Sequence, residues 1–331
     1  MRSMSSLALL ALVGCASERD FAERKQTDYW YQSPNNEIDI LWVVDDSCSM
    51  GEEQDTLAEG FTSFVSQMET SGTDFHIGVI STSFDYSDPD RGKLLGDPPY
   101  LTLDDDYVSL FSDRAILGVE GSDKEKGLEA AEWALSPTMV TGANKGFVRA
   151  DAQLLVVFVS DEEDCSDEGA LEGEVAEECY RQRERLVPVT EYVDSFRSMK
   201  GDSENVQVSA IVGTEDESCQ DAYPGSRYIQ TAAMTGGSVG DICASNWSNM
   251  LSDLGLTASG VRTSFQTTYA ARPETLKVFV DDEEIQESET DGWTYDSDTW
   301  YVTFGVNAIP ERDAEIYAEY TVLSGAEAPS G

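Results

Sequence analysis

The sequence predicts an α/β fold with a doubly wound, mainly parallel sheet, followed by a small antiparallel β module. Short apolar runs alternate with segments of helical spacing over residues 37–256. This order is typical of a parallel sheet with helices on both faces. The run at residues 154–159 (LLVVFV) is apolar throughout, so it needs cover on both faces and predicts a central strand. After about residue 262, apolar residues recur at every second position instead.

The elements of the first part follow in order along the chain. Strands are expected at the apolar runs 38–44, 75–80, 154–159 and 206–212, with a last strand after Gly237. Helices are expected where apolar residues share one face, at residues 52–69, 104–110, 124–135, 188–196 and 247–254. These elements would form one domain over residues 37–256.

The second part, residues 263–323, predicts an antiparallel β module. Apolar and polar residues alternate over 276–280, 300–304 and 316–320, and turns are expected at 281–282 and 291–292. Trp293 and Trp300 could form a carbohydrate platform or lie in the core, and alternating aromatic residues favour the core. Residues 324–331 are expected to be a disordered tail.

The N-terminus predicts export. Arg2 precedes an apolar stretch, residues 7–13, that is too short to span a bilayer. It ends in Leu12-Val13-Gly14-Cys15, which resembles the lipobox of bacterial lipoproteins. That resemblance implies a signal peptide over residues 1–14, a lipid on Cys15, and membrane contact through this lipid alone. Ala16 favours the outer membrane, and residues 15–36 would be a polar tether. The alternative is an ordinary signal peptide with a chance cysteine.

The composition is strongly acidic, with a formal net charge of -43. Nucleic acid is excluded as a partner, since such a chain cannot neutralise phosphates. A basic partner is one explanation of the charge. A solvated surface adapted to a saline environment is the other, and the even spread of acids along the chain favours it.

The cysteines indicate disulfides, which persist in exported proteins. Apart from the lipobox cysteine five remain, so at least one is unpaired or joined to another chain. Cys219 and Cys243 are the preferred pair, because both follow predicted strands in one region. For the other three cysteines the alternatives are Cys48–Cys165 and Cys165–Cys179.

Two predicted strands end in oxygen-bearing side chains. Asp45, Ser47 and Ser49 follow the first strand, and Asp161 follows the central one. Parallel strands carry these residues to one edge of the sheet, where open α/β folds place their sites. Two nearby carboxylates repel each other unless a proton or cation intervenes, and hard cations prefer such oxygen ligands. The competing interpretation makes Ser49 a helix N-cap.

This pattern resembles the von Willebrand factor type A (VWA) domain, also called the integrin I-like domain, with its metal-ion-dependent adhesion site. That family has D-x-S-x-S in the first loop, a threonine in the second and an aspartate in the third. Asp45, Ser47, Ser49 and Asp161 match the first and third elements. Ser122 takes the threonine position, and its neighbour Asp123 is the alternative ligand. The resemblance covers about residues 37–256.

The resemblance implies a bound Mg²⁺, or Mn²⁺ or Ca²⁺ in its place, with one coordination position open to a carboxylate of the partner. Acidic residues crowd the same rim. Asp46, Glu162 and Asp164 could form an outer shell or hold a second cation, but a solvated acidic loop is the favoured interpretation.

Enzyme chemistry is poorly supported by the sequence. A phosphatase of the haloacid dehalogenase type needs a second acid two residues after Asp45, and Ser47 stands there. The only histidine, His76, lies within a predicted strand, and there is no cysteine and histidine set for zinc.

The sequence therefore predicts a lipid-anchored, exported binding protein of the bacterial envelope. It would engage a protein or surface ligand through a metal-bridged carboxylate, in adhesion or envelope assembly. The alternative is a structural lipoprotein or assembly scaffold without metal-regulated ligand binding.

Overall fold

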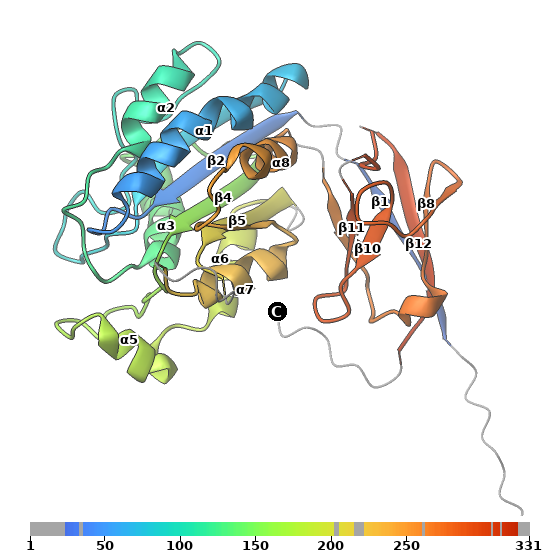
Figure 1. Ribbon diagram of the computed structural model, residues 1–331. Helices are drawn as coiled ribbons and strands as arrows, with labels where there is room; N and C mark the ends of the chain where they lie inside the picture. Colours follow the sequence, from blue (N-terminus) through green and yellow to red (C-terminus); the bar gives the residue numbers. More distant parts are fainter. Residues whose placement is uncertain are drawn as a thin grey trace, which may run out of the picture.

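A computed structural model describes residues 24–32, 36–201, 205–214, 222–259, 262–305, 307–311 and 313–323. These residues form an α/β part and a separate β sandwich (Figure 1). The predicted signal peptide, Cys15, Cys219 and the predicted tail lie outside the described residues. Within the described ranges, no helix combines the length and the apolar character needed to cross a membrane.

The α/β part is built on a five-stranded parallel sheet in the order β3-β2-β4-β5-β6. Its strands are β2 (Glu37–Val44), β3 (Asp74–Ser81), β4 (Gln153–Ser160), β5 (Val206–Val212) and β6 (Val239–Asp241). Strand β4 is the middle strand and every one of its residues is buried, which confirms the central position predicted from its apolar run. A continuous apolar sequence is stable in water only when both faces of the strand are covered.

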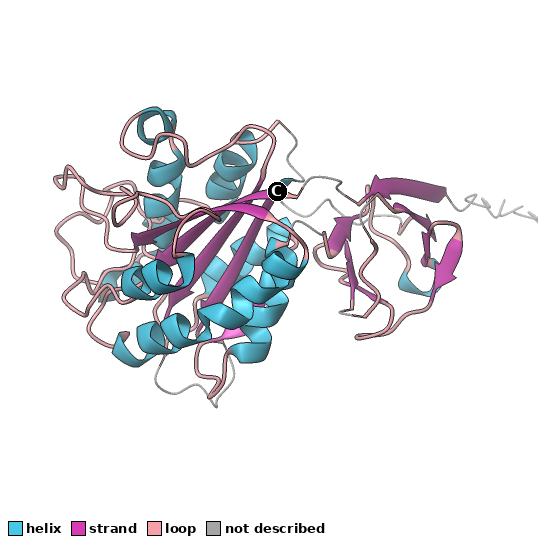
Figure 2. Ribbon diagram, turned by 90° about the horizontal axis from the view of Figure 1, so that it is seen from above, coloured by secondary structure: helices cyan, strands magenta, loops and turns pink. Residues whose placement is uncertain are grey.

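Helices cover both faces of this sheet (Figure 2). They are α1 (Gly51–Thr70), α2 (Tyr107–Ala115), α3 (Gly127–Leu135), α4 (Pro137–Thr141), α5 (Glu177–Arg181), α6 (Val189–Ser198), α7 (Ser226–Thr235) and α8 (Ser248–Ala258), with short 3₁₀ turns at Arg183–Arg185 and Pro273–Thr275. Apolar side chains of α1, α2 and α8 share one core with half of the sheet residues. Those of α3, α6 and α7 share a second core with the other half. Alternate residues of each strand therefore feed opposite layers.

Seven strands form the β sandwich: β1 (Lys25–Tyr31), β7 (Ser264–Gln266), β8 (Lys277–Val280), β9 (Glu283–Ile285), β10 (Trp293–Tyr295), β11 (Tyr301–Phe304) and β12 (Glu315–Thr321). They make antiparallel sheets in the orders β1-β12-β8-β9 and β10-β11-β7. Trp293 and Trp300 are 4% and 7% exposed, which confirms the core interpretation and removes them as a surface platform.

One boundary of the sequence prediction is wrong. Residues 15–36 were expected to be a polar tether, but β1 lies within them and pairs with β12 along its whole length, from Lys25↔Thr321 to Tyr31↔Glu315. Trp30 points inward, with its ring centroid 5.6 Å from that of Phe265. The partner of β1 lies almost three hundred positions further along the chain, so no local pattern reveals this strand.

Charged side chains meet in the interior at the amino-terminal end of the sheet. Asp39, on β2, is fully buried and accepts hydrogen bonds from the backbone N–H of Arg149 at 2.7 Å, from its Nε at 2.8 Å and from Lys200 Nζ at 3.0 Å. His76 Nδ1 lies 3.8 Å from the same carboxylate and 2.9 Å from the carbonyl oxygen of Phe147. This network lies at the opposite end of β2 from Asp45.

Candidate metal and ligand site

The loops after β2 and β4 meet at the carboxyl end of the sheet. The two strands are parallel neighbours, with Val44 opposite Val159, and the backbone N–H of Asp45 donates to the carbonyl oxygen of Val159 at 2.9 Å. The structure thus brings Asp45 beside Ser160 and Asp161, as the sequence predicts for parallel neighbours.

Asp45 is the most enclosed of the predicted ligands, with no exposed surface. Its Oδ1 accepts from the backbone N–H of Ser47 at 2.8 Å, and its Oδ2 accepts from Ser160 Oγ at 2.6 Å. Burial raises the pKa of Asp45 to about 7, and the nearby charge of Asp161 adds to the rise despite these hydrogen bonds. None of the residues that shift the pKa of Asp45 is a cation, so none of them stabilises the charge of this carboxylate at neutral pH by ion pairing.

Ser47 and Ser49 lie between the two aspartates. Their hydroxyl oxygens are 3.3 Å apart. Burial raises the pKa of Asp161, although a hydrogen bond from Ser49 opposes the rise. Asp161 is 5% exposed, and its Oδ1 has no hydrogen-bond partner among the described residues.

The interpretation of Ser49 as a helix cap is wrong. Helix α1 begins after Met50, and no side-chain hydrogen bond caps it. The Ser49 hydroxyl instead bonds the Asp161 carboxylate. Two buried carboxylates, one with an oxygen that lacks a hydrogen bond, and two hydroxyls form a donor set that suits a hard divalent cation.

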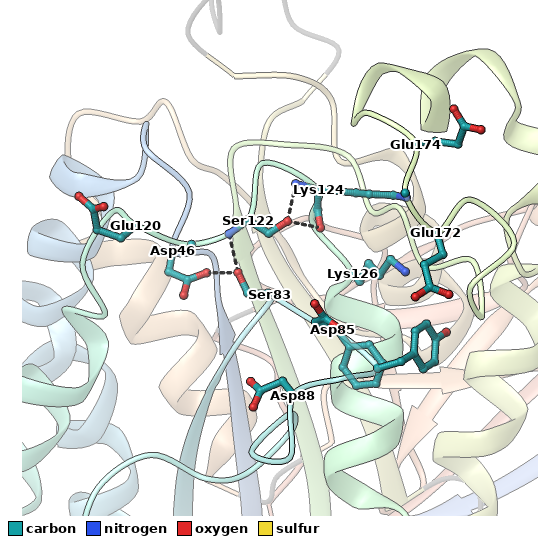
Figure 3. A pocket seen from close by; sticks show the side chains of 14 residues that line it. Asp46, Ser83, Asp85, Asp88, Glu120, Ser122, Lys124, Lys126, Glu172 and Glu174 are labelled. Carbon is teal, nitrogen blue, oxygen red and sulfur yellow. Dashed lines mark hydrogen bonds between the residues drawn. The ribbon is translucent and has the colours of Figure 1, made fainter.

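Ser122 lies beside this group and does not join it. Its backbone N–H donates to Ser83 Oγ at 2.8 Å, and Ser83 Oγ donates to Asp46 Oδ1 at 2.7 Å (Figure 3). Its own Oγ accepts from the backbone N–H of Lys124 at 3.0 Å. No hydrogen bond described for this chain links Ser122 to Asp45 or Asp161. The alternative ligand, Asp123, is exposed.

The Gly121-Ser122 turn is fixed against Asp46. The backbone N–H of Gly121 donates to the Asp46 carbonyl oxygen at 2.8 Å. A Cβ atom at Gly121 would overlap the Asp46 carboxylate, so glycine is required for this close approach. The loop that carries Ser122 is therefore held through Asp46 rather than through the two predicted metal-binding aspartates.

Sequence reasoning missed Glu125. It is fully buried and its Oε2 accepts a hydrogen bond from Thr82 Oγ1, while its Oε1 has no hydrogen-bond partner among the described residues. Burial raises the pKa of Glu125, and the charge of Asp45 adds to the rise. Its position between two lysines is typical of an exposed residue, so the sequence offers no signal for it. A second missed residue is Ser160, whose hydroxyl holds Asp45.

The three acids suggested as an outer shell or a second cation site have separate partners. Asp46 Oδ1 accepts from Ser81 and Ser83, both at 2.7 Å. Asp164 accepts from Arg227 Nε at 2.8 Å and from the backbone N–H of Leu128 at 3.0 Å. Glu162 is half-buried, and burial together with the charges of Asp45 and Asp161 raises its pKa to about 7. Among the described residues, no three histidine, cysteine or acidic side chains are grouped as a metal site.

A pocket of about 510 Å³ opens beside the site (Figure 3). Asp46, Ser83 and Ser122 line one side of it, and Lys124 and Lys126 line another part. Lys126 pairs with Asp167, and Lys124 Nζ donates to the carbonyl oxygen of Leu171 at 2.7 Å. The pocket has room for a side chain or peptide segment beside Asp46, whereas neither Asp45 nor Asp161 lines it.

The acidic loop after β4 is closed by a disulfide between Cys165 and Cys179, whose Cα atoms are 5.5 Å apart. Cys48 is an exposed free thiol, so the alternative Cys48–Cys165 pair is wrong. The predicted Cys219–Cys243 pair includes a residue outside the described ranges. The backbone N–H of Cys165 donates to the carbonyl oxygen of Glu125 at 2.6 Å. The disulfide-closed loop is therefore hydrogen-bonded to the backbone of the buried glutamate.

No family model matches this chain, and no curated protein matches it in sequence. Solved structures match at low identity. Two crystal forms of the pilus adhesin SpaC from Lactobacillus rhamnosus GG, one in an open conformation, are 11% identical, with TM-scores of 0.40 and 0.41. They match 92% of this chain and 42% of SpaC.

Proximal thread matrix protein 1 from the mussel byssus is 13% identical, with a TM-score of 0.41. The match covers 72% of this chain and 51% of the mussel protein. The chain therefore spans about half of the mussel protein and less than half of SpaC. At these identities and scores, no property of either protein is transferred to this chain.

Proposed function

We propose that this protein is an exported binding protein that captures a carboxylate-bearing ligand through a divalent cation held between the loops after β2 and β4. The observation that carries the proposal is the buried pair Asp45 and Asp161, with Ser47 and Ser49 between them and Asp161 Oδ1 unpartnered. Such a pair is costly unless a cation or protons compensate it.

The residues would contribute different kinds of ligand to the ion. Asp45 and Asp161 supply the negative charge, directly or through water, and Ser47 and Ser49 supply neutral oxygens. Ser122 and Glu125 would complete the set only after a side-chain movement. A bound Mg²⁺, Mn²⁺ or Ca²⁺ supplies an open coordination position that a partner carboxylate fills. Because several ligands are neutral, the site retains positive charge for that carboxylate.

The setting of this function is proposed from the sequence. A lipid on Cys15 would hold the protein at the bacterial envelope, on the outer membrane, where it serves adhesion or envelope assembly without catalysing a reaction. The partner is a protein or a surface ligand. The second candidate is a structural lipoprotein or scaffold without metal-regulated ligand binding.

A divalent-dependent pull-down from envelope extracts tests the proposal. Immobilised protein should retain a partner in Mg²⁺ and release it in EDTA, with ionic strength matched in both buffers so that simple screening does not differ. The Asp45→Asn variant, which keeps the side-chain shape, should retain nothing in either buffer. Capture that is equal with Mg²⁺ and EDTA would favour the scaffold.

Metal binding should also change how stability depends on pH. The pKa of Asp45 is raised to about 7 in the folded protein. The folded state is therefore favoured in acid, and this advantage is lost as the pH rises from about 4 to about 7. Without divalent cations we expect the melting temperature to fall across this window. Mg²⁺ should raise it more at about pH 7.5 than at about pH 5, because protons compete with the ion in acid.

Thermal melts with and without Mg²⁺ check this pH prediction. Asp45→Asn serves as the control, since it removes both the titrating group and the charge. A Mg²⁺-induced shift that is independent of pH, or that persists in this variant, would contradict it.

A further inference from the structure

A second pocket, of about 600 Å³, adjoins the metal-site pocket. It lies between the loop after β3 and helices α3 and α6. Its apolar wall is formed by Phe84, Tyr86, Trp133 and Met199, and the first two of these also line the pocket beside the metal site. A single ligand could therefore reach both pockets across the Phe84–Tyr86 pair, whose rings meet edge to face at 5.4 Å.

A buried carboxylate lines this second pocket without a full set of partners. Glu129, on α3, is 5% exposed. Its Oε1 accepts a hydrogen bond from the Tyr86 hydroxyl, whereas its Oε2 has no hydrogen-bond partner among the described residues. The Lys126 ammonium lies 3.8 Å from Oε2 and is closer to Asp167. A buried carboxylate oxygen that lacks a hydrogen bond calls for a donor, and a cationic donor is the strongest.

The remaining charges around the pocket are also negative. Glu132 and Glu168 line it, and Arg91 is the only basic side chain among its described lining residues. The Arg91 guanidinium is already engaged, 4.5 Å from the Trp133 ring centroid and bonded through Nη1 to the Asp88 carbonyl oxygen at 2.9 Å. Aromatic faces together with surplus carboxylates favour an organic cation over an anion or a neutral group.

We propose that this second pocket binds an arginine side chain of the partner. The aliphatic stem packs on Phe84, Trp133 and Met199, and the planar guanidinium donates to Glu129 Oε2. Arginine suits the site better than lysine, because its flat head both stacks on aromatic rings and pairs with a carboxylate. The inference rests on the proposed function in one respect, namely that the same partner places a carboxylate at the metal. The partner would then carry an acidic residue and an arginine close together in space.

Binding of N-acetylarginine amide, followed by NMR chemical-shift titration, tests this pocket separately from the metal site. The wild-type protein in EDTA should bind the probe saturably, with a Kd on the order of millimolar. N-acetylcitrulline amide, which has almost the same shape without the charge, should bind about tenfold more weakly or worse. Glu129→Gln should weaken the arginine probe by about the same factor, or about 1.4 kcal/mol. Glu132→Gln should cause a smaller loss.

The controls separate failure of this inference from failure of the proposed function. Glu191→Gln, an exposed position on α6 that does not line the pocket, should bind the probe like wild type. Asp45→Ala should lose Mg²⁺ and keep the arginine probe. Equal binding of the citrulline and arginine probes, or unchanged binding in both Glu129→Gln and Glu132→Gln, would overturn the arginine pocket while leaving the metal site standing.

Discussion

Replacing Asp45 with alanine is expected to weaken Mg²⁺ binding by about 100-fold or more, as measured by calorimetry. Loss of an outer-shell partner alone typically costs a metal site about 10–100-fold in affinity, and Asp45 is one of two carboxylates that supply charge here. Its Oδ1 also orients the Ser47 backbone and its Oδ2 holds Ser160. The substitution therefore removes charge and geometry together.

Two further variants show whether a loss of Mg²⁺ affinity in Asp45→Ala comes from the charge of Asp45. Asp45→Asn keeps the shape of the side chain and removes the charge, so a similar loss assigns the effect to charge. Asp55→Asn, at an exposed position on α1, should bind Mg²⁺ like wild type. Equal Mg²⁺ affinity in wild type and Asp45→Ala would eliminate the metal site.

Replacing Asp39 with alanine should lower the free energy of unfolding by about 3–5 kcal/mol, the usual cost of leaving a buried charge without its partner. The side chain of Lys200 is 1% exposed and would lose its ion pair with Asp39. Arg149 would lose the two hydrogen bonds that its backbone N–H and Nε make with Asp39. Denaturant unfolding of the α/β part, followed by the fluorescence of the buried Trp42, measures the effect.

The matched control is Asp74→Ala. Asp74 also pairs with Arg149, at 2.8 Å, but its side chain is 55% exposed, and such pairs contribute less than about 1 kcal/mol. Asp39 lies at the far end of β2 from Asp45, so folded Asp39→Ala should keep the Mg²⁺ affinity of the proposed site. Equal destabilisation by the two substitutions would show that burial of the network does not matter.

The parallel sheet could be predicted because its strands are nearly continuous apolar runs. Residues 154–159 required a central position, and β4 has one. The convergence of Asp45 and Asp161 followed from parallel pairing alone. Both inferences depend only on hydrophobic burial and on strand direction, which local sequence encodes.

The failures concern contacts between residues distant in sequence. Four of the seven residues of β1 are polar, and its pairing with β12 has no local signature. Asp164 is a similar case. The run of acids around it suggested a cation ligand, but its partner is Arg227 on α7. Glu125 looked exposed between lysines but is buried beside Thr82. Side-chain direction in a loop depends on such partners, and a single sequence does not reveal them.

The position of β1 has a mechanical consequence. The chain leaves β1 at Tyr31 and enters β2 at Glu37, and β2 ends at the loop that begins with Asp45. A pull between the amino-terminal end and a ligand held at that loop would pass along two strands that are already extended. The covalent backbone would transmit this tension, while the β1–β12 hydrogen bonds run across it. Under load the sandwich would stay folded around β1, because the pull runs along this strand and does not separate it from β12. The loop that begins with Asp45 would move together with β1 and β2.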